Sequence, residues 1–133
     1  MTGLSTPAQG TVLLAEDDQD IRTLIELKLT GAGFTVIAVA DGAAARNVVL
    51  TRPVSIALLD VTMPELTGLE LLQELRLDPE TATLPVILLS ARSQEFDVAA
   101  GLALGASDYV VKPFSPRDLL DRVRRALGEV AAG

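Results

Sequence analysis

The sequence predicts an α/β domain in which helices cover both faces of a parallel β-sheet. Five short apolar runs recur along the 133 residues, and each is followed by a segment whose apolar residues have helical spacing. Three of the five runs are continuous, which is typical of strands buried on both faces of a parallel sheet. Because crossovers between parallel strands are right-handed, this alternation leaves few other topologies.

The first two strand–helix units occupy the N-terminal part of the chain. An apolar run over residues 11–15 predicts the first strand, because three consecutive acids end it. Apolar residues at helical spacing follow from Asp20, which is placed to cap a helix, until a pair of glycines stops the pattern. The second strand is predicted over residues 34–40, and Asp41-Gly42 then opens an alanine-rich helix that ends near residue 52.

The remaining three units follow the same alternation. The third strand is a continuous apolar run that ends in a single acid, and the fourth is a bare aliphatic run that is too short for a helix. Pro116 suits the first turn of the last helix. The strands are predicted at residues 56–60, 86–89 and 109–111, and the helices at residues 68–77, 96–104 and 116–127.

Length and composition limit the architecture and the classes of function. With 49% apolar residues the chain can bury a sizeable core, and we expect one domain over residues 10–128 with a flexible tail at 1–9 and a second tail at 129–133. The excess of 18 Asp and Glu over 11 Lys and Arg, a net charge of −7, argues against direct binding to nucleic acid or membranes. The chain has no cysteine and no histidine, which excludes disulfides and thiolate or imidazole metal ligands. Since no apolar run reaches ~18 residues and residues 1–10 do not resemble a signal peptide, we expect a cytoplasmic protein.

Polar side chains stand where the predicted strands end. Glu16 and Asp17 follow the first strand, Asp60 ends the third, Ser90 closes the fourth and Lys112 ends the fifth. Ligands of open α/β sheets bind at the edge formed by the carboxyl ends of the strands, so these side chains are expected to meet there. An acidic cluster that faces a lysine suits a divalent cation and a phosphoryl group.

Mg²⁺ fits such a cluster because it accepts a few carboxylates and keeps several waters. The main-chain carbonyl of Thr62 could add one more oxygen, and Asp60 could attack a phosphoryl donor to form an aspartyl phosphate. Each residue alone has an ordinary explanation: acids after a strand are usually solvated, and a hydroxyl such as that of Ser90 commonly caps a turn. A lysine on an apolar run is less usual. Polar residues at the ends of four predicted strands, in this order along the chain, are hard to attribute to chance.

With these motifs the sequence resembles the receiver domains of two-component response regulators. The resemblance covers nearly the whole chain and is carried by VLLAEDD (12–18), LLDVTMP (58–64) followed by Gly68, PVILLSA (85–91) and GASDYVVKPF (105–114). It implies a flavodoxin-like doubly wound sheet with the strand order 2-1-3-4-5, the order found in a chemotaxis receiver.

The resemblance also implies a role for each residue of the acidic site. Asp60 would be the phosphoacceptor. Asp17, Asp60 and the carbonyl of Thr62 would bind Mg²⁺ or Mn²⁺ directly, and Glu16 would hold the ion through water. Asp18 is not required for metal binding in this family.

On the other side of the phosphoryl group, Lys112 would contact its oxygens. Ser90 would supply the switch hydroxyl, and Tyr109 would be the ring that moves with it. The Lys112–Pro113 peptide bond would be cis. The helix from about residue 94 to residue 104 would join Tyr109 in the face that changes on phosphorylation.

We therefore expect a phosphorylation-controlled signalling module and not an enzyme that turns over a substrate. A histidine kinase or a phosphotransfer protein would donate the phosphoryl group, because this chain has no histidine, and a downstream protein would read the result. One alternative is a hydrolase with an aspartyl-phosphate intermediate, which needs a second acid two residues after the nucleophile, where this chain has Thr62. Another is a pseudo-receiver that acts as a scaffold, which requires a broken site.

The chain stops soon after its last predicted helix, which fits either a single-domain regulator or a receiver taken from a longer one. Asp108 and Arg122 could pair, but Val98, Ala99 and Ala100 stand where family members that dimerise through charged pairs have an arginine. We expect a monomer, with at most weak dimerisation on phosphorylation.

Overall fold

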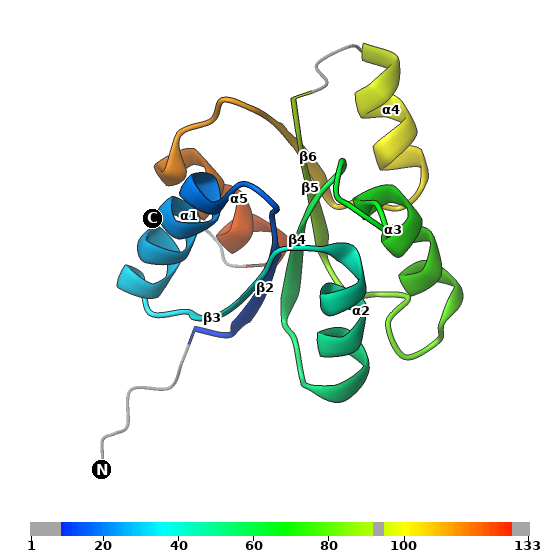
Figure 1. Ribbon diagram of the computed structural model, residues 1–133, viewed down its shortest axis with the longest axis horizontal. Helices are drawn as coiled ribbons and strands as arrows, with labels where there is room; N and C mark the ends of the chain where they lie inside the picture. The colour runs from blue at the N-terminus through cyan, green and yellow to red at the C-terminus, as the bar shows by residue number, and fades with distance from the viewer. Residues whose placement is uncertain (1–8, 92–94, 129–133) are drawn as a thin grey trace.

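The protein is described by a computed structural model that covers residues 9–91 and 95–128 (Figure 1). Five parallel strands form one sheet in the order β3-β2-β4-β5-β6. Counted along the chain this is the order 2-1-3-4-5, which confirms the predicted topology. The strands are β2 (Thr11–Ala15), β3 (Thr35–Val39), β4 (Ile56–Asp60), β5 (Val86–Ser90) and β6 (Asp108–Val111).

Five helices cover the two faces of the sheet, as predicted. They are α1 (Gln19–Gly31), α2 (Gly42–Thr51), α3 (Gly68–Leu77), α4 (Glu95–Ala103) and α5 (Pro116–Ala126). In Figure 1, α1 and α5 lie on one side of the sheet and α2, α3 and α4 on the other. Among the described residues, no helix combines the length and the apolar character needed to cross a membrane.

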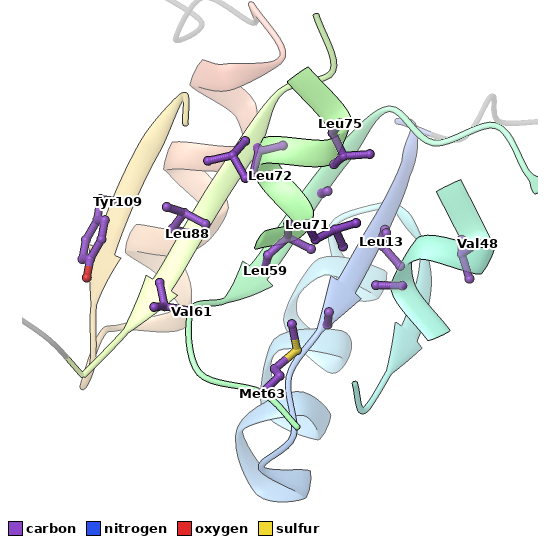
Figure 2. Close-up of a cluster of buried hydrophobic side chains, with 14 residues drawn as sticks. Leu13, Val48, Leu59, Val61, Met63, Leu71, Leu72, Leu75, Leu88 and Tyr109 are labelled. Carbon is purple, nitrogen blue, oxygen red and sulfur yellow. The ribbon is translucent and has the colours of Figure 1, made fainter. Parts of the chain in front are cut away.

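Alternate residues of the strands divide the core into two clusters. On β4, Ala57 and Leu59 face α2 and α3, whereas Ile56 and Leu58 face α1 and α5. Figure 2 shows the first cluster, in which side chains of β2, β4, β5 and β6 meet the leucines of α3. Because β4 and β5 are buried on both faces, their sequences read as continuous apolar runs.

The start of α1 differs from the prediction. We expected Asp20 to cap this helix, but Asp18 is the N-cap residue, and its Oδ1 accepts a hydrogen bond of 3.0 Å from the main-chain nitrogen of Ile21. Asp20 lies two residues further on, in the first turn of the helix, where a negative charge is still favourable. The third acid of the motif therefore has a structural task that is separate from the metal site.

The other element ends agree with the prediction to within about two residues. Residues 1–8 and 129–133 of the predicted tails lie outside the described residues, and so does the predicted beginning of the output face at residue 94. Gln9, the last residue of the predicted N-terminal tail, is described, and its main-chain nitrogen donates a hydrogen bond of 3.1 Å to the carbonyl of Gly33.

Candidate functional site

The sheet brings the predicted polar residues to one edge. Glu16 follows β2 directly, Asp60 is the last residue of β4, Ser90 is the last residue of β5, and Lys112 follows β6. The strand register keeps these ends level, since Asp60 pairs with Leu89 and Ser90 lies one residue beyond it. Glu16, Asp60 and Ser90 are the buried polar or charged side chains of the described chain. A domain with so few buried polar groups has gathered them in one place, which indicates a functional site.

Lys112 joins the two buried carboxylates. Its Nζ lies 2.7 Å from Oε1 of Glu16 and 3.1 Å from Oδ2 of Asp60. Burial alone would lower the pKa of the Lys112 ammonium, but the hydrogen bonds and charges of Glu16 and Asp60 outweigh burial and raise the pKa above its usual 10.5. Lys112 is therefore protonated at neutral pH. The Lys112–Pro113 peptide bond is cis, in agreement with the resemblance.

Glu16 has the least favourable surroundings of the acids. Its side chain is fully buried, and burial, followed by the hydrogen bond with Asp60, raises the pKa of Glu16 from 4.5 to about 7. Oε2 accepts a hydrogen bond of 3.1 Å from the main-chain nitrogen of Asp18. This pKa lies above that of Glu16 in the unfolded chain. The folded state therefore becomes less stable relative to the unfolded state as the pH rises through about 7 and the buried Glu16 ionises.

A divalent cation would relieve this strain. One carboxylate oxygen from each of Glu16, Asp17 and Asp60 lies within 4.8 Å of the others. Within the described chain, Oε1 of Glu16 has no hydrogen-bond donor of good geometry, although Lys112 lies beside it as an ion pair. Three carboxylates outnumber the single ammonium, and all the available donors are hard oxygens. These residues fit Mg²⁺ or Mn²⁺.

The residues after Asp60 hold its side chain in place. The main-chain nitrogen of Thr62 donates a hydrogen bond of 3.1 Å to Oδ1 of Asp60, while Lys112 donates to Oδ2. Both oxygens of Asp60 are thereby fixed at the edge of the sheet. A direct contact between the Thr62 carbonyl and a cation remains a prediction.

Two glycines fix the path of the loop between β4 and α3, a task that the sequence alone does not predict. A Cβ on Gly68 would overlap the main-chain oxygen of Asp60, and a Cβ on Gly42 would overlap that of Leu66. The main-chain nitrogen of Gly68 also donates a hydrogen bond of 3.2 Å to the carbonyl of Val61. The sequence offers one local signal for these glycines: each follows an N-cap residue and begins a helix.

The predicted output face contains a buried ring and an ion pair. Tyr109 on β6 is 7% exposed. Arg122 on α5 pairs with Asp108 at 2.9 Å, as suggested from the sequence, and also with Asp118 at 3.0 Å. The charges of Asp108 and Arg122 are therefore matched within one chain.

A test of the metal site uses Asp17→Ala. We expect Mg²⁺ to raise the melting temperature of the wild-type protein by a few degrees, because the ion binds the folded state and relieves repulsion among three carboxylates. The variant should lose most of this increase while melting no lower than the wild type without metal. Thermal melting with and without MgCl₂ measures both effects, and Asp20→Ala serves as a control on an exposed acid of α1. Equal stabilisation of Asp17→Ala and the wild type would contradict the site.

Comparisons with known proteins agree with this geometry. The family model for the response regulator receiver domain matches residues 12–124. The transcriptional regulatory protein GltR of Pseudomonas aeruginosa is 44% identical over 117 residues, which are 88% of this chain and 48% of GltR. The chain thus spans about half the length of the curated relatives that it matches.

Solved structures show the same fold. A Francisella response regulator receiver domain superposes with a TM-score of 0.85 at 33% identity, over 90% of this chain and 98% of that one. The chemotaxis response regulator CheY4 of Vibrio cholerae superposes with a TM-score of 0.83 at 30% identity, over 91% of this chain and 99% of CheY4. The fold, the acidic edge of the sheet and the matched sequence therefore lead to one conclusion: the chain belongs to the response regulator receiver domains of two-component signalling.

Proposed function

We propose that the protein is a cytoplasmic phosphorylation switch in which Asp60 accepts a phosphoryl group from a histidine kinase or a phosphotransfer protein. The observation that carries this proposal is the position of Asp60, a buried carboxylate at the end of the central strand β4, beside Lys112 and the other two acids of the cluster. The carboxylate of Asp60, the ammonium group of Lys112 and the carboxylate oxygens that would bind a metal ion thus surround one point.

In the proposed reaction, a carboxylate oxygen of Asp60 forms a bond to phosphorus while the bond between phosphorus and the donor nitrogen breaks. The electron pair of that bond remains on the donor, whose imidazole is released. Phosphoryl transfer needs mainly positioning and charge stabilisation. Lys112 would stabilise charge on the phosphoryl oxygens, while Thr62 and Lys112 keep the carboxylate oriented before the donor arrives.

Glu16, Asp17 and Asp60 would hold Mg²⁺ or Mn²⁺, with the carbonyl of Thr62 as a further oxygen. When bound, the ion supplies positive charge that offsets the charge on the transferring group. Either a direct or a water-mediated contact between Glu16 and the ion would satisfy its buried Oε1.

The switch would follow from the change in charge at Asp60. A phosphoryl group adds strong acceptor oxygens and additional negative charge. It would compete with Glu16 for Lys112 and attract the hydroxyl of Ser90 at the end of β5. We propose that movement at Ser90 is passed to Tyr109 on the next strand, and that a protein partner reads the face around Tyr109.

The first test is chemical. Incubation with a small phosphodonor such as acetyl phosphate should add one phosphoryl group per chain when Mg²⁺ is present and none when the metal is chelated. Intact-mass spectrometry counts the groups. The control is a protein sample whose melting temperature rises with Mg²⁺. If the mass of such a sample stays unchanged with every phosphodonor and metal tested, the proposal is overturned.

The oligomeric state gives a second test. We expect a monomer before phosphorylation, because Asp108 and Arg122 are paired within the chain and α4 offers the small residues Ala99 and Ala100 at its surface. Light scattering at several concentrations, with and without the phosphodonor, measures the mass. A tight dimer of the unphosphorylated protein would contradict this prediction.

A further inference from the structure

Arg22 lies near the start of α1 and reaches back to the loop that carries the acids. Its main-chain nitrogen donates a hydrogen bond of 2.9 Å to the carbonyl of Asp18, and Nη1 of its side chain donates one of 2.8 Å to the carbonyl of Glu16. Side chains of a helix tilt toward its N-terminus, so a long side chain at this position is directed at the preceding loop. Arg22 therefore ties the first turn of α1 to the end of β2.

The carbonyl of Glu16 needs a donor at this point. Glu16 is fully buried, and Ala15 before it is the last residue of β2 with register partners on both neighbouring strands. A buried carbonyl without a donor lowers the stability of the folded state. The guanidinium of Arg22 supplies that donor, and charged donors form the shorter and stronger hydrogen bonds. The contact fixes the plane of the peptide group that joins Glu16 to Asp17.

Asp17 depends on this peptide group more than the other two acids do. The carboxylates of Glu16 and Asp60 both contact Lys112. The side chain of Asp17 is exposed, and its carboxylate has no hydrogen-bond or ion-pair partner among the described residues, although one of its oxygens lies within 4.8 Å of oxygens of the other two acids. The direction of this carboxylate is therefore set by the backbone that carries it.

We propose that Arg22 is a positioning residue of the metal site: its guanidinium holds the carbonyl of Glu16, and through that peptide group it directs the carboxylate of Asp17 toward the ion. The inference rests on the proposed function, in which Asp17 binds Mg²⁺ or Mn²⁺. It adds a basic residue outside the acidic cluster on which the affinity for the metal depends.

The charge of Arg22 and its hydrogen bond predict opposite effects on metal affinity. A guanidinium near a divalent cation repels that cation, so loss of the charge alone should strengthen metal binding. Loss of the hydrogen bond frees the peptide group before Asp17 and should weaken metal binding. Arg22 is half-buried and forms no ion pair with the described residues, so an exchange at this position breaks no salt bridge. The sign of the change in affinity therefore separates the two effects.

The test compares the affinity for Mg²⁺ in three variants. Arg22→Met keeps the apolar stem and the helix preference of arginine but has no donor. Its dissociation constant, measured from melting temperatures over a series of MgCl₂ concentrations, should be about tenfold higher than that of the wild type. Arg22→Lys keeps the charge and a donor, and should bind within about twofold of the wild type. Lys28→Met removes the same charge from an exposed position of α1 and should bind no more weakly than the wild type.

Equal or tighter binding of Mg²⁺ by Arg22→Met would overturn the inference, and so would a loss of affinity in Arg22→Lys as large as that in Arg22→Met. Labelling by the phosphodonor separates this inference from the proposed function. If the wild type binds Mg²⁺ but is never labelled, the proposed phosphorylation fails, while the ratio of the dissociation constants still decides the role of Arg22. If the wild type is labelled and Arg22→Met binds Mg²⁺ equally well, the positioning role fails alone.

The peptide group gives a second readout that needs no metal. The amide of Asp17 belongs to the same peptide group as the carbonyl of Glu16, so its resonance in a ¹⁵N–¹H NMR spectrum reports on the hydrogen bond from Arg22. In metal-free Arg22→Met this resonance should move further than any amide resonance of β5, and in Lys28→Met it should stay in place. An Asp17 resonance that stays in place in Arg22→Met would overturn the inference.

Discussion

The Asp60→Asn protein is expected to take up no phosphoryl group under conditions that label the wild type completely. An amide oxygen is a weak nucleophile, and the exchange also removes one of the negative charges that attract the cation. Asparagine keeps the size of the side chain and an oxygen that can accept the 3.1 Å hydrogen bond from Thr62. We expect the rate of labelling to fall by about 10³-fold or more, since the covalent step has no substitute.

The measurement is intact-mass spectrometry over a time course, followed by identification of the labelled peptide. Asp18→Asn is the matched control: the same chemical exchange at the adjacent acidic motif, on the exposed N-cap of α1, where asparagine caps a helix as well as aspartate. This control should be labelled like the wild type. If Asp60→Asn were labelled to the same extent as the wild type, but on another residue, the phosphoacceptor would have been assigned to the wrong carboxylate.

Removal of the charge at Asp60 has a second consequence that needs no phosphodonor. Glu16 loses a like charge from its surroundings, so the pKa of Glu16 should fall below about 7, while burial, the largest cause of the shift, still holds it above the value of an ordinary glutamate. The metal-free variant is therefore expected to be at least as stable as the wild type near neutral pH.

The sequence was sufficient for the sheet and for the residues at its edge. Apolar runs such as residues 56–60 have to be buried on both faces, and Asp60, at the end of such a run, has no local reason to be there. Burial of the whole strand then places its last side chain at the carboxyl edge, beside the ends of β2 and β5.

The sequence did not reveal which of three consecutive acids is buried. Glu16, Asp17 and Asp18 look alike as a solvated group after a strand, yet Glu16 is fully buried while the other two are exposed. Glu16 follows β2 directly, and Lys112, which follows the last strand of the sheet, lies against it as an ion pair. A contact of this kind depends on the assembled sheet, and no local pattern encodes it.

The same reason explains why the capping residue of α1 was misplaced. Asp18 and Asp20 are both suitable caps by residue type, and the choice depends on where the backbone leaves its extended conformation. Asp18 keeps that conformation, and its main-chain nitrogen also donates a hydrogen bond to Oε2 of Glu16. The helix start is thus set by the site, which the local sequence cannot show.

The close approach of Gly68 to Asp60 leads to the largest expected effect on stability. Alanine at position 68 would place its Cβ closer to the main-chain oxygen of Asp60 than van der Waals contact allows, and 3.2 Å from Cα of Val61. Neither neighbour is a flexible side chain, so the β4–α3 loop or the start of α3 has to move. We expect Gly68→Ala to lower the free energy of unfolding by about 2–4 kcal/mol, although alanine favours helices over glycine. Urea denaturation measures the loss.

Gly31→Ala, in the open position on α1, should stay within about 0.5 kcal/mol of the wild type, which isolates the steric effect from the general effect of replacing glycine. The loop that Gly68 holds also carries Thr62, whose main-chain nitrogen orients Asp60. Any Gly68→Ala protein that remains folded should therefore be labelled more slowly by the phosphodonor than its stability alone explains. Wild-type stability and wild-type labelling in this variant would together show that the loop accommodates a side chain, and that the packing of Gly68 on Asp60 does not position the phosphoacceptor.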